Sequence, residues 1–235
     1  VLVFVGIVPW DSVLEHIDLG TIFLLMGMMI IVNVASQSGL FEYLAIRTAK
    51  AAHGSPVRVL ILFALVTAVT SAFLDNVTTV LLLTPMLLYI AKVMKVNPVP
   101  YLIAEIMASN IGGMATLIGD PPNIMIASAA NLTFNEFLFT MAPIAAVDLA
   151  VVLIMFILIY GKIMKVEPSE QANIKKTIDQ LDENNAVKDR KLFNKAIATL
   201  IIVVCLFFIH SNIGEYLHVI LPFIDSSMTL EPAEV

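Results

Sequence analysis

The sequence has one cysteine and few charged residues, and both shortages narrow the class of protein. Cys205 stands in an apolar run, so the chain holds neither a disulfide framework nor a thiolate metal site. Asp, Glu, Lys and Arg make up 14% of the 235 residues, whereas hydrophobic residues make up 59%. The mean hydropathy of +0.93 excludes an ordinary soluble domain. Strand-period alternation is missing, and several apolar stretches approach the roughly 20 residues that span a bilayer as helix. The composition predicts an all-α integral membrane protein.

Motifs of ATP-driven pumps and of intramembrane enzymes are missing as well. The sequence contains no Gly-x-x-x-x-Gly-Lys-Ser/Thr loop for a nucleotide and no His-Glu-x-x-His pair for zinc. An aspartyl intramembrane protease needs Gly-x-Gly-Asp, but Leu117 takes the place of the first glycine before Ile118-Gly119-Asp120. We therefore predict that the chain is not an enzyme and has no cofactor. ATP can act only through a separate subunit.

Apolar runs divide the chain into three parts. A transmembrane repeat covers residues 1–164, a charged cytoplasmic linker 165–192, and the start of the following transmembrane region 193–235. The linker is expected to be solvated, and flexible or loosely helical. Four of the smaller segments are spans: one ends at residue 9, and the others cover 19–37, 143–163 and 193–210. Two are amphipathic, an interfacial segment at 39–52 and a short piece at 133–141. Between them we predict a hairpin at 56–95 with arms 56–74 and 77–94, and a broken helix at 98–130 with halves 98–111 and 123–130. Because the chain begins at Val1 inside an apolar run and ends on what resembles the approach to another helix, we expect a fragment.

The thirteen Lys and Arg residues predict the orientation of these segments. They gather in the loops 38–58, 92–97 and 162–195, whereas 10–18, 131–142 and 211–235 contain none. By the positive-inside rule the Lys/Arg-rich loops face the cytoplasm of an inner or plasma membrane. Both ends of the hairpin at 56–95 then face inward, and its tip enters the membrane from the cytoplasmic side. Arm length alone leaves open whether the hairpin is re-entrant or crosses fully.

A first polar cluster lies at the predicted hairpin tip. Asp75 and Asn76 supply side-chain oxygens, and Thr78 and Thr79 add hydroxyls at the start of the following helix. The N–H groups and partial positive charge of that helix start suit an anionic oxygen. The carbonyls that end the preceding arm suit a cation. Irregular polar backbone survives at membrane depth only where it lines a protein-walled cavity, so the tip predicts a binding site.

A second polar cluster interrupts the next membrane segment. Its glycines permit positive φ and close backbone approach, and its two prolines, Pro121 and Pro122, cannot continue the preceding helix. The candidate substrate- or ion-binding residues here are Ser109, Asn110, Gly112, Gly113, Thr116, Gly119, Asp120 and Asn123. A helix broken near mid-membrane is the discontinuous helix that transporters use. Combined with the tip, the cluster predicts a Na⁺ site at Asp75, Asn76 and Asn110.

Structural roles compete with these binding roles. Glycines in membrane helices often serve only close helix packing, and Asn or Ser side chains often bond a neighbouring helix. Asp75 could accordingly be a structural partner of Asn110 or of a helix that this sequence does not contain. Glu105, on the short helix before the break, is left without an assigned role.

Four stretches of the chain resemble a known group of membrane proteins. They are Gly27–Val32, Gly39–Ala45, Ser71–Pro85 with Asp75-Asn76-Val77-Thr78-Thr79, and Ala108–Ile126 with Ile118-Gly119-Asp120-Pro121-Pro122-Asn123. They resemble the ion transporter superfamily, and within it the arsenite-permease and P-protein-like, citrate-transporter-like permeases. The resemblance runs continuously from about residue 19 to 150.

The resemblance implies two inverted repeats, each with a re-entrant hairpin followed by a broken helix. Na⁺ and substrate then meet at the two hairpin tips, and a second repeat of the same protein completes the site. The dicarboxylate branch has Ser-Asn-Thr at the tip, where this chain has Asp75, Asn76 and Val77. Asn76 carries over directly, Asp75 introduces a carboxylate that can carry a proton or bind a cation, and Val77 removes a side-chain ligand. A dicarboxylate substrate therefore does not follow. Met114 is given no ligand role.

The leading functional hypothesis is secondary active transport of a small ion, coupled to a Na⁺ or H⁺ gradient. Arsenite, Na⁺/H⁺ exchange, and organic or inorganic anions all fit the superfamily. An ion channel with the same polar cavity is the alternative, and an intramembrane enzyme is disfavoured. The expected partners are membrane lipid, the ion substrate, the second repeat and a second copy in a homodimer, with no nucleic acid.

Overall fold

The computed structural model describes residues 19–220, with side chains placed through residue 209. Ten helices follow one another in this range, and it contains no strand. Four helices are long and apolar enough to cross a membrane: α1 (Leu19–Gln37), α4 (Asn76–Val93), α7 (Phe134–Tyr160) and the part of α10 (Arg190–Ile220) that ends at Ile209. The predicted all-α integral membrane fold is thereby confirmed. The span expected to end at residue 9 lies outside the described residues.

Helix α2 (Leu40–Ala51) lies between two glycines in the left-handed region. Gly39 has a φ of 86° and Gly54 a φ of 74°. A Cβ atom on Gly39 would lie 1.8 Å from the carbonyl oxygen of Ala186, and one on Gly54 would lie 2.5 Å from that of Gln171. Only glycine therefore permits both the turn and the close approach of the 165–192 linker at these positions.

Helices α3 (Pro56–Ser71) and α4 form the predicted hairpin. Pro56 occupies the first turn of α3, where its missing N–H costs no hydrogen bond and its fixed φ suits the helix. Asp75 caps α4 and ends the short turn that joins the two arms. The arms begin and end within three residues of the predicted 56–74 and 77–94.

Helices α5 (Val99–Gly113) and α6 (Pro121–Ala130) are the two halves of the predicted broken helix. The intervening residues 114–120 have no regular structure. Pro121 and Pro122 occupy the first turn of α6, where a donor would have no intrahelical acceptor. Helix α6 ends at Asn131, which adopts the left-handed conformation with φ 54°.

Helix α7 corrects the prediction of a separate piece at 133–141 and a span at 143–163. It runs unbroken from Phe134 to Tyr160 with Pro143 inside it. Thr133 and Glu136 form a capping box at its start. Pro143 removes only the donor to the carbonyl of Phe139, and membrane helices tolerate such a loss where the flanking residues remain helical.

The linker takes the helical form of the two that were predicted, flexible or loosely helical. It contains α8 (Pro168–Asp179) and α9 (Glu183–Ala186), and α8 buries Ile174 and Ile178. The Gln171 side chain donates to the His53 carbonyl over 3.2 Å. The Lys188 amide donates to the Ser38 carbonyl over 3.3 Å. The linker is thus attached along α2 rather than suspended in solvent.

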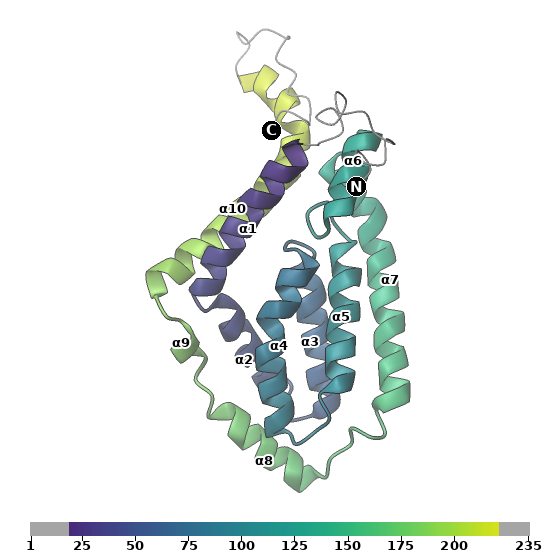
Figure 1. Cartoon of the computed structure of the whole chain (residues 1–235), viewed down its shortest axis with the longest axis vertical. Helices are drawn as coiled ribbons and strands as arrows, with labels where there is room; N and C mark the ends of the chain where they lie inside the picture. The colour runs from purple at the N-terminus through teal and green to yellow at the C-terminus, as the bar shows by residue number, and fades with distance from the viewer. Residues whose placement is uncertain (1–18, 221–235) are drawn as a thin grey trace, which may run out of the picture.

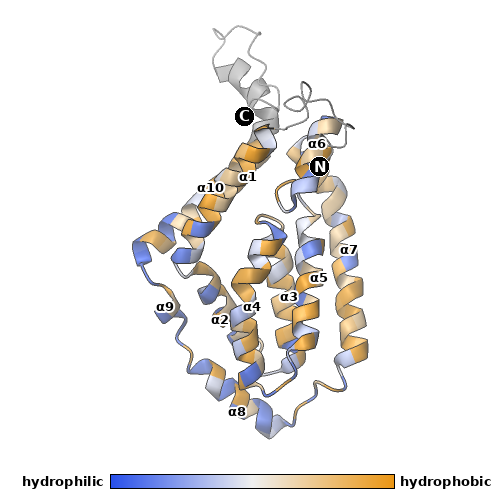
Figure 2. Ribbon diagram, viewed as in Figure 1, coloured by the Kyte–Doolittle hydropathy of each residue, from blue (hydrophilic) through white to orange (hydrophobic). Residues whose placement is uncertain are grey.

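The helices are arranged so that the hairpin tip meets the break between α5 and α6. Helix α5 packs against α3, α4 and α7, whereas α1 packs against α10. Figure 1 shows α3, α4 and α5 side by side, with α8 lying across their ends and α6 extending beyond the tip. Figure 2 shows hydrophobic residues along α1, α7 and α10, and hydrophilic residues concentrated on α8 and α9. The main core includes Phe63, Leu83, Leu87, Ile90 and Tyr101, all of them buried between the hairpin and its neighbours.

Candidate functional site

The hairpin tip uses its own side chains to cap α4. The Asp75 Oδ1 atom accepts from the Thr78 amide over 2.8 Å, and the Asn76 Oδ1 atom accepts from the Val77 amide over 2.9 Å. The Thr79 amide donates to the Asp75 carbonyl over 3.1 Å. The prediction that this helix start offers free N–H groups to an anion is therefore wrong for these three amides. Local competition by Asp and Asn side chains explains the difference.

Three further hydrogen bonds fasten the tip to α5 and to the break. The Asn76 amide nitrogen donates to Asn110 Oδ1 over 3.0 Å. The buried Ser71 hydroxyl donates to the Ser109 carbonyl over 2.7 Å. The Thr116 hydroxyl donates to the Ala72 carbonyl at the end of α3. These bonds place the tip and the break at the same depth.

The break satisfies most of its polar groups internally. The Asn123 side-chain nitrogen donates to the carbonyls of Gly113, over 3.0 Å, and Thr116, over 2.8 Å. The Thr116 Oγ1 atom in turn accepts from the amides of Ile118 and Gly119, over 3.3 and 3.2 Å. Asn123 and Thr116 therefore join the two halves of the broken helix, through the Asn123 side-chain nitrogen and the Thr116 hydroxyl.

The glycines of the break serve close packing. None of Gly112, Gly113 and Gly119 has a positive φ, so the expected use of the left-handed region is wrong at these positions. A Cβ atom on Gly112 would lie 2.1 Å from the Ala68 carbonyl oxygen of α3. One on Gly119 would lie 2.5 Å from the Gly113 carbonyl oxygen. The close backbone approach that the sequence predicted is what these glycines provide.

Asp120 stands at the start of α6 without capping it. Its carboxyl lies within electrostatic range of the Asp75 carboxyl on the hairpin tip. Both residues are half-buried, and Asn110 is exposed. Asp75, Asp120, Asn76 and Asn110 thus form an oxygen-rich group from three elements, here called the tip cluster. Carboxylate and amide oxygens brought together in this way suit a monovalent cation or a proton.

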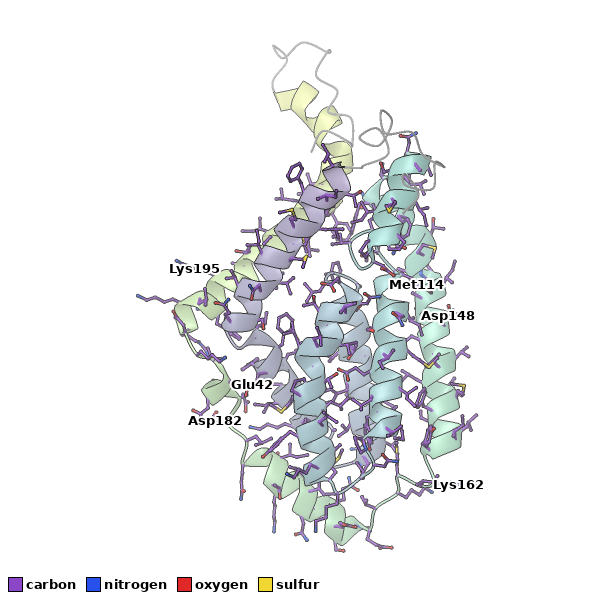
Figure 3. The ribbon with its side chains drawn as sticks, viewed as in Figure 1. Glu42, Met114, Asp148, Lys162, Asp182 and Lys195 are labelled. Atoms are coloured by element: carbon purple, nitrogen blue, oxygen red, sulfur yellow. The ribbon has the colours of Figure 1, made fainter. Side chains whose placement is uncertain are left out.

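The predicted site residues therefore separate into groups with different surroundings. The tip cluster has side-chain atoms open to a ligand, whereas Ser109, Thr116, Asn123 and the three glycines build the break. Thr78 is half-buried, and the Thr79 side chain is fully buried, with no hydrogen bond to its hydroxyl in the described part of the chain. Met114 caps the end of α5, as Figure 3 shows at the break.

Two features of the site were missed from the sequence. Ser71 carries one of the bonds that position the tip, and its place within the polar run 71–79 was a signal for it. Glu105, buried in α5, bonds the Thr84 hydroxyl of α4. A carboxylate inside an apolar helix was the signal there, but its partner lies 21 residues away in the sequence.

A hollow of about 430 Å³ lies away from the tip cluster, on the charged side of the molecule. It is bordered by α2, α8 and α9, with Arg47, Lys50, His53 and Lys175 facing Asp179 and Glu183. Lys50 and Glu183 form a salt bridge across it. This salt bridge joins α2 to α9, so the hollow is a junction between α2 and the linker.

Comparison with known proteins identifies the family. The CitMHS citrate transporter family matches residues 1–232. An uncharacterized transporter of Mycobacterium bovis is 47% identical over 194 residues, which are 83% of this chain and 44% of that protein. A 46 kDa membrane protein of Mycobacterium leprae gives the same identity and coverage. The human P protein is 47% identical over 120 residues, which are 51% of this chain and 14% of the P protein.

The chain spans about half the length of the mycobacterial relatives that it matches. The predicted resemblance to P-protein-like and citrate-transporter-like permeases is confirmed. The apolar helices and the match to a family of transporters show an integral membrane protein. With a family match that extends over nearly all of its residues, the chain belongs to the CitMHS citrate transporter family.

Proposed function

We propose that the chain is the first of two inverted repeats of a secondary active transporter that binds its coupling ion, Na⁺ or H⁺, at the tip cluster. The observation that carries the proposal is that Asp75 and Asp120 lie within electrostatic range of each other, with Asp75 next in the chain to the Asn76 that bonds Asn110. Two carboxylates within range of each other repel unless a cation or a proton lies between them. Binding of the ion there would draw the hairpin tip and the broken helix together, which is a means of coupling ion binding to a conformational change.

The transported substrate is proposed to be a small ion, with arsenite and organic or inorganic anions as the candidates. Citrate enters the set because the matching family carries that name. The amides at the start of α4 already have acceptors, so this repeat offers an anion few donors besides the exposed Asn110 side chain. We propose that the corresponding hairpin of the second repeat supplies the remaining donors.

The proposed orientation places the α8 side in the cytoplasm of an inner or plasma membrane. The Lys- and Arg-bearing ends of α2, α3 and α4 lie on the side where α8 crosses, and so does Lys162 just after α7 (Figures 1 and 3), which agrees with the positive-inside rule. The hairpin is proposed to be re-entrant, because its tip lies beside the break while α6 extends further. A homodimer within the lipid bilayer is the proposed assembly.

The experiment is a transport assay on the full-length protein reconstituted in lipid vesicles. Candidate ions are offered singly, with a Na⁺ gradient or an H⁺ gradient imposed separately. A secondary transporter shows saturable uptake and accumulates substrate against its gradient. Uptake that neither saturates nor accumulates under either gradient would favour the channel instead.

Asp75→Asn tests the tip cluster within that assay. Asn retains an oxygen for the Thr78 amide, so the helix cap survives while the charge is lost. Coupled uptake should fall to background, with folded protein still present in the membrane. Asp182→Asn is the matched control, because Asp182 also caps a helix, through the Asn184 amide at 2.9 Å, but lies in the linker. Full coupled uptake by Asp75→Asn would refute the assignment.

A further inference from the structure

Glu105 is a buried acid that the tip cluster does not use. It lies in α5 with 1% of its surface exposed. The Thr84 hydroxyl of α4 donates to its Oε2 atom over 3.0 Å. The Oε1 atom is buried and has no hydrogen-bond partner within the described residues. One half of the carboxyl is therefore fixed by the hairpin and the other half is unpaired.

No counter-charge faces this carboxyl from the helices packed around it. Helix α5 packs against α3, α4 and α7, and its own Tyr101 donates to the Pro56 carbonyl over 3.2 Å. The other ionisable side chains on those helices are Arg58, Tyr89, Lys92, Glu136, Asp148 and Tyr160, of which all but Tyr160 are exposed. Tyr160 stacks on Phe156. A carboxylate held in apolar surroundings without a cation is costly, whereas a protonated carboxyl is neutral.

Glu105 lies about one helical turn before the part of α5 that contacts the hairpin tip. Ser109 and Gly112 follow it by four and seven residues and so share its helix face. The Ser109 carbonyl accepts from Ser71, and Gly112 lies against the Ala68 backbone. Asn110 of the tip cluster is five residues further on, which is about 7.5 Å along the helix axis. A change in the charge of Glu105 would act on the same helix that carries one side of the tip cluster.

We propose that Glu105 is a proton-binding group of this transporter, held in place by Thr84. The proton forms an O–H bond at Oε1, and on release it returns to water that reaches the exposed Asn110. Thr84 continues to donate to Oε2 in both states. A Na⁺ ion fits this position poorly, because it needs several oxygen ligands and the Thr84 hydroxyl directs its hydrogen at the carboxyl. The role in transport rests on the proposed function, whereas the protonation itself does not.

The test is infrared spectroscopy of the full-length protein in lipid vesicles, recorded as a difference between pH values without any substrate. A protonated carboxyl in apolar surroundings has a C=O stretch that is separate from the amide bands. That band should be present in the wild type and absent in Glu105→Gln. Glu42→Gln is the matched control, because Glu42 is an exposed glutamate on α2 (Figure 3), and it should leave the band unchanged.

Thr84→Val provides a second measurement that does not require Glu105 to be replaced. Removing the hydroxyl donor should move the frequency of the same band, since a hydrogen bond to the carboxyl is lost. If Glu105→Gln fails to assemble, an unmoved band in Thr84→Val overturns the proposal. An unchanged band in a folded Glu105→Gln protein overturns it as well.

Transport then separates this inference from the proposed function. If the protein accumulates an ion, Glu105→Gln should abolish the pH dependence of uptake at constant Na⁺, and an unaltered pH profile would refute the role of Glu105 in transport. If no ion is transported, the proposed function fails, whereas the infrared band still decides whether Glu105 binds a proton.

Discussion

The hairpin tip and the break in the following helix are both polar interruptions of apolar structure, yet they use their polar groups in opposite ways. At the break, Thr116 and Asn123 bond the backbone on both sides of the gap, and glycines bring the chains into contact. At the tip, Asp75 and Asn76 use one oxygen each for the start of α4, and the Asn76 side-chain nitrogen donates to Asn110.

This difference separates scaffold from site. A polar atom that already has a buried partner in the protein has little to offer a ligand, and removing it leaves that partner unsatisfied. A polar atom at an exposed contact can be removed at small cost to folding. Substitutions in the break should therefore act on stability, and substitutions at the tip should act on transport. Four changes test this division, in order of decreasing effect on stability.

Gly112→Ala should have the largest effect. The new Cβ would meet the Ala68 carbonyl oxygen at 2.1 Å, and a backbone atom cannot move aside as a flexible side chain can. We expect a loss of at least about 3 kcal/mol in unfolding free energy, seen as failure of the full-length protein to purify as a single species. Gly27→Ala is the control, because nothing lies within 4 Å of its added Cβ. A stable Gly112→Ala protein would show that α3 and α5 can separate freely.

Asn123→Ala should come second. It leaves the carbonyls of Gly113 and Thr116 without their side-chain donor, which should lower stability by about 1–3 kcal/mol. Thermal unfolding of the purified full-length protein measures this loss. Asn173→Ala, at an exposed position on α8, should leave the midpoint unchanged. If Asn123→Ala keeps the wild-type unfolding midpoint but loses transport, Asn123 belongs to the site, and the assignment of the break to the scaffold is wrong.

Asn110→Ala should have the opposite effect to the two changes in the break, with a small loss of stability and a large loss of transport. Its bond to Asn76 is exposed, so the loss in stability should stay below about 1 kcal/mol. Coupled uptake should nevertheless fall by at least about tenfold, because the tip cluster loses a polar ligand at membrane depth. Asn33→Ala removes an equally exposed amide contact, to Gln37 at 3.3 Å on α1, and should affect neither measurement. Unfolding of Asn110→Ala comparable to that of Asn123→Ala would remove the distinction between tip and break.

The fold could be predicted where the signal is local. Hydropathy over a window of helix length gave α1, both hairpin arms and the two halves of the broken helix within a few residues. It failed at Pro143, because a proline marks a break only where the flanking residues do not hold the helix. In the linker it left a flexible and a loosely helical form open, because an excess of charge concealed Ile174 and Ile178, four residues apart on one face of α8.

The site could be predicted by residue type but not by partner. Asp75, Asn76, Asn110 and Asp120 stood out because polar groups in apolar runs are costly. Nothing in the sequence indicated that Asn123 would bond Gly113 and Thr116, since that contact depends on the path of residues 114–120. The partnership of Glu105 with Thr84 was hidden for the same reason, because it depends on the packing of α4 against α5.

Glu183→Gln should have the smallest effect, and it lies outside both tip and break. The hydrogen bond from Lys50 holds the pKa of the Glu183 carboxyl below its ordinary value. Because the folded-state pKa is depressed, the contribution of this pair is present at neutral pH and is lost as the pH falls below the ordinary glutamate range and through the folded-state pKa. The pair is also weakened by salt, as exposed ion pairs are.

Limited proteolysis of the 165–192 linker should therefore become faster on acidification in the wild type and lose most of that pH dependence in Glu183→Gln. Glu170→Gln, on the exposed face of α8, should behave as the wild type. Coupled uptake at neutral pH should be unaltered, because the salt bridge contacts neither the tip cluster nor the break. A transport loss as large as that of Asn110→Ala would mean that the linker acts on the tip cluster. The linker would then have to be counted as a third region, besides tip and break, that affects transport.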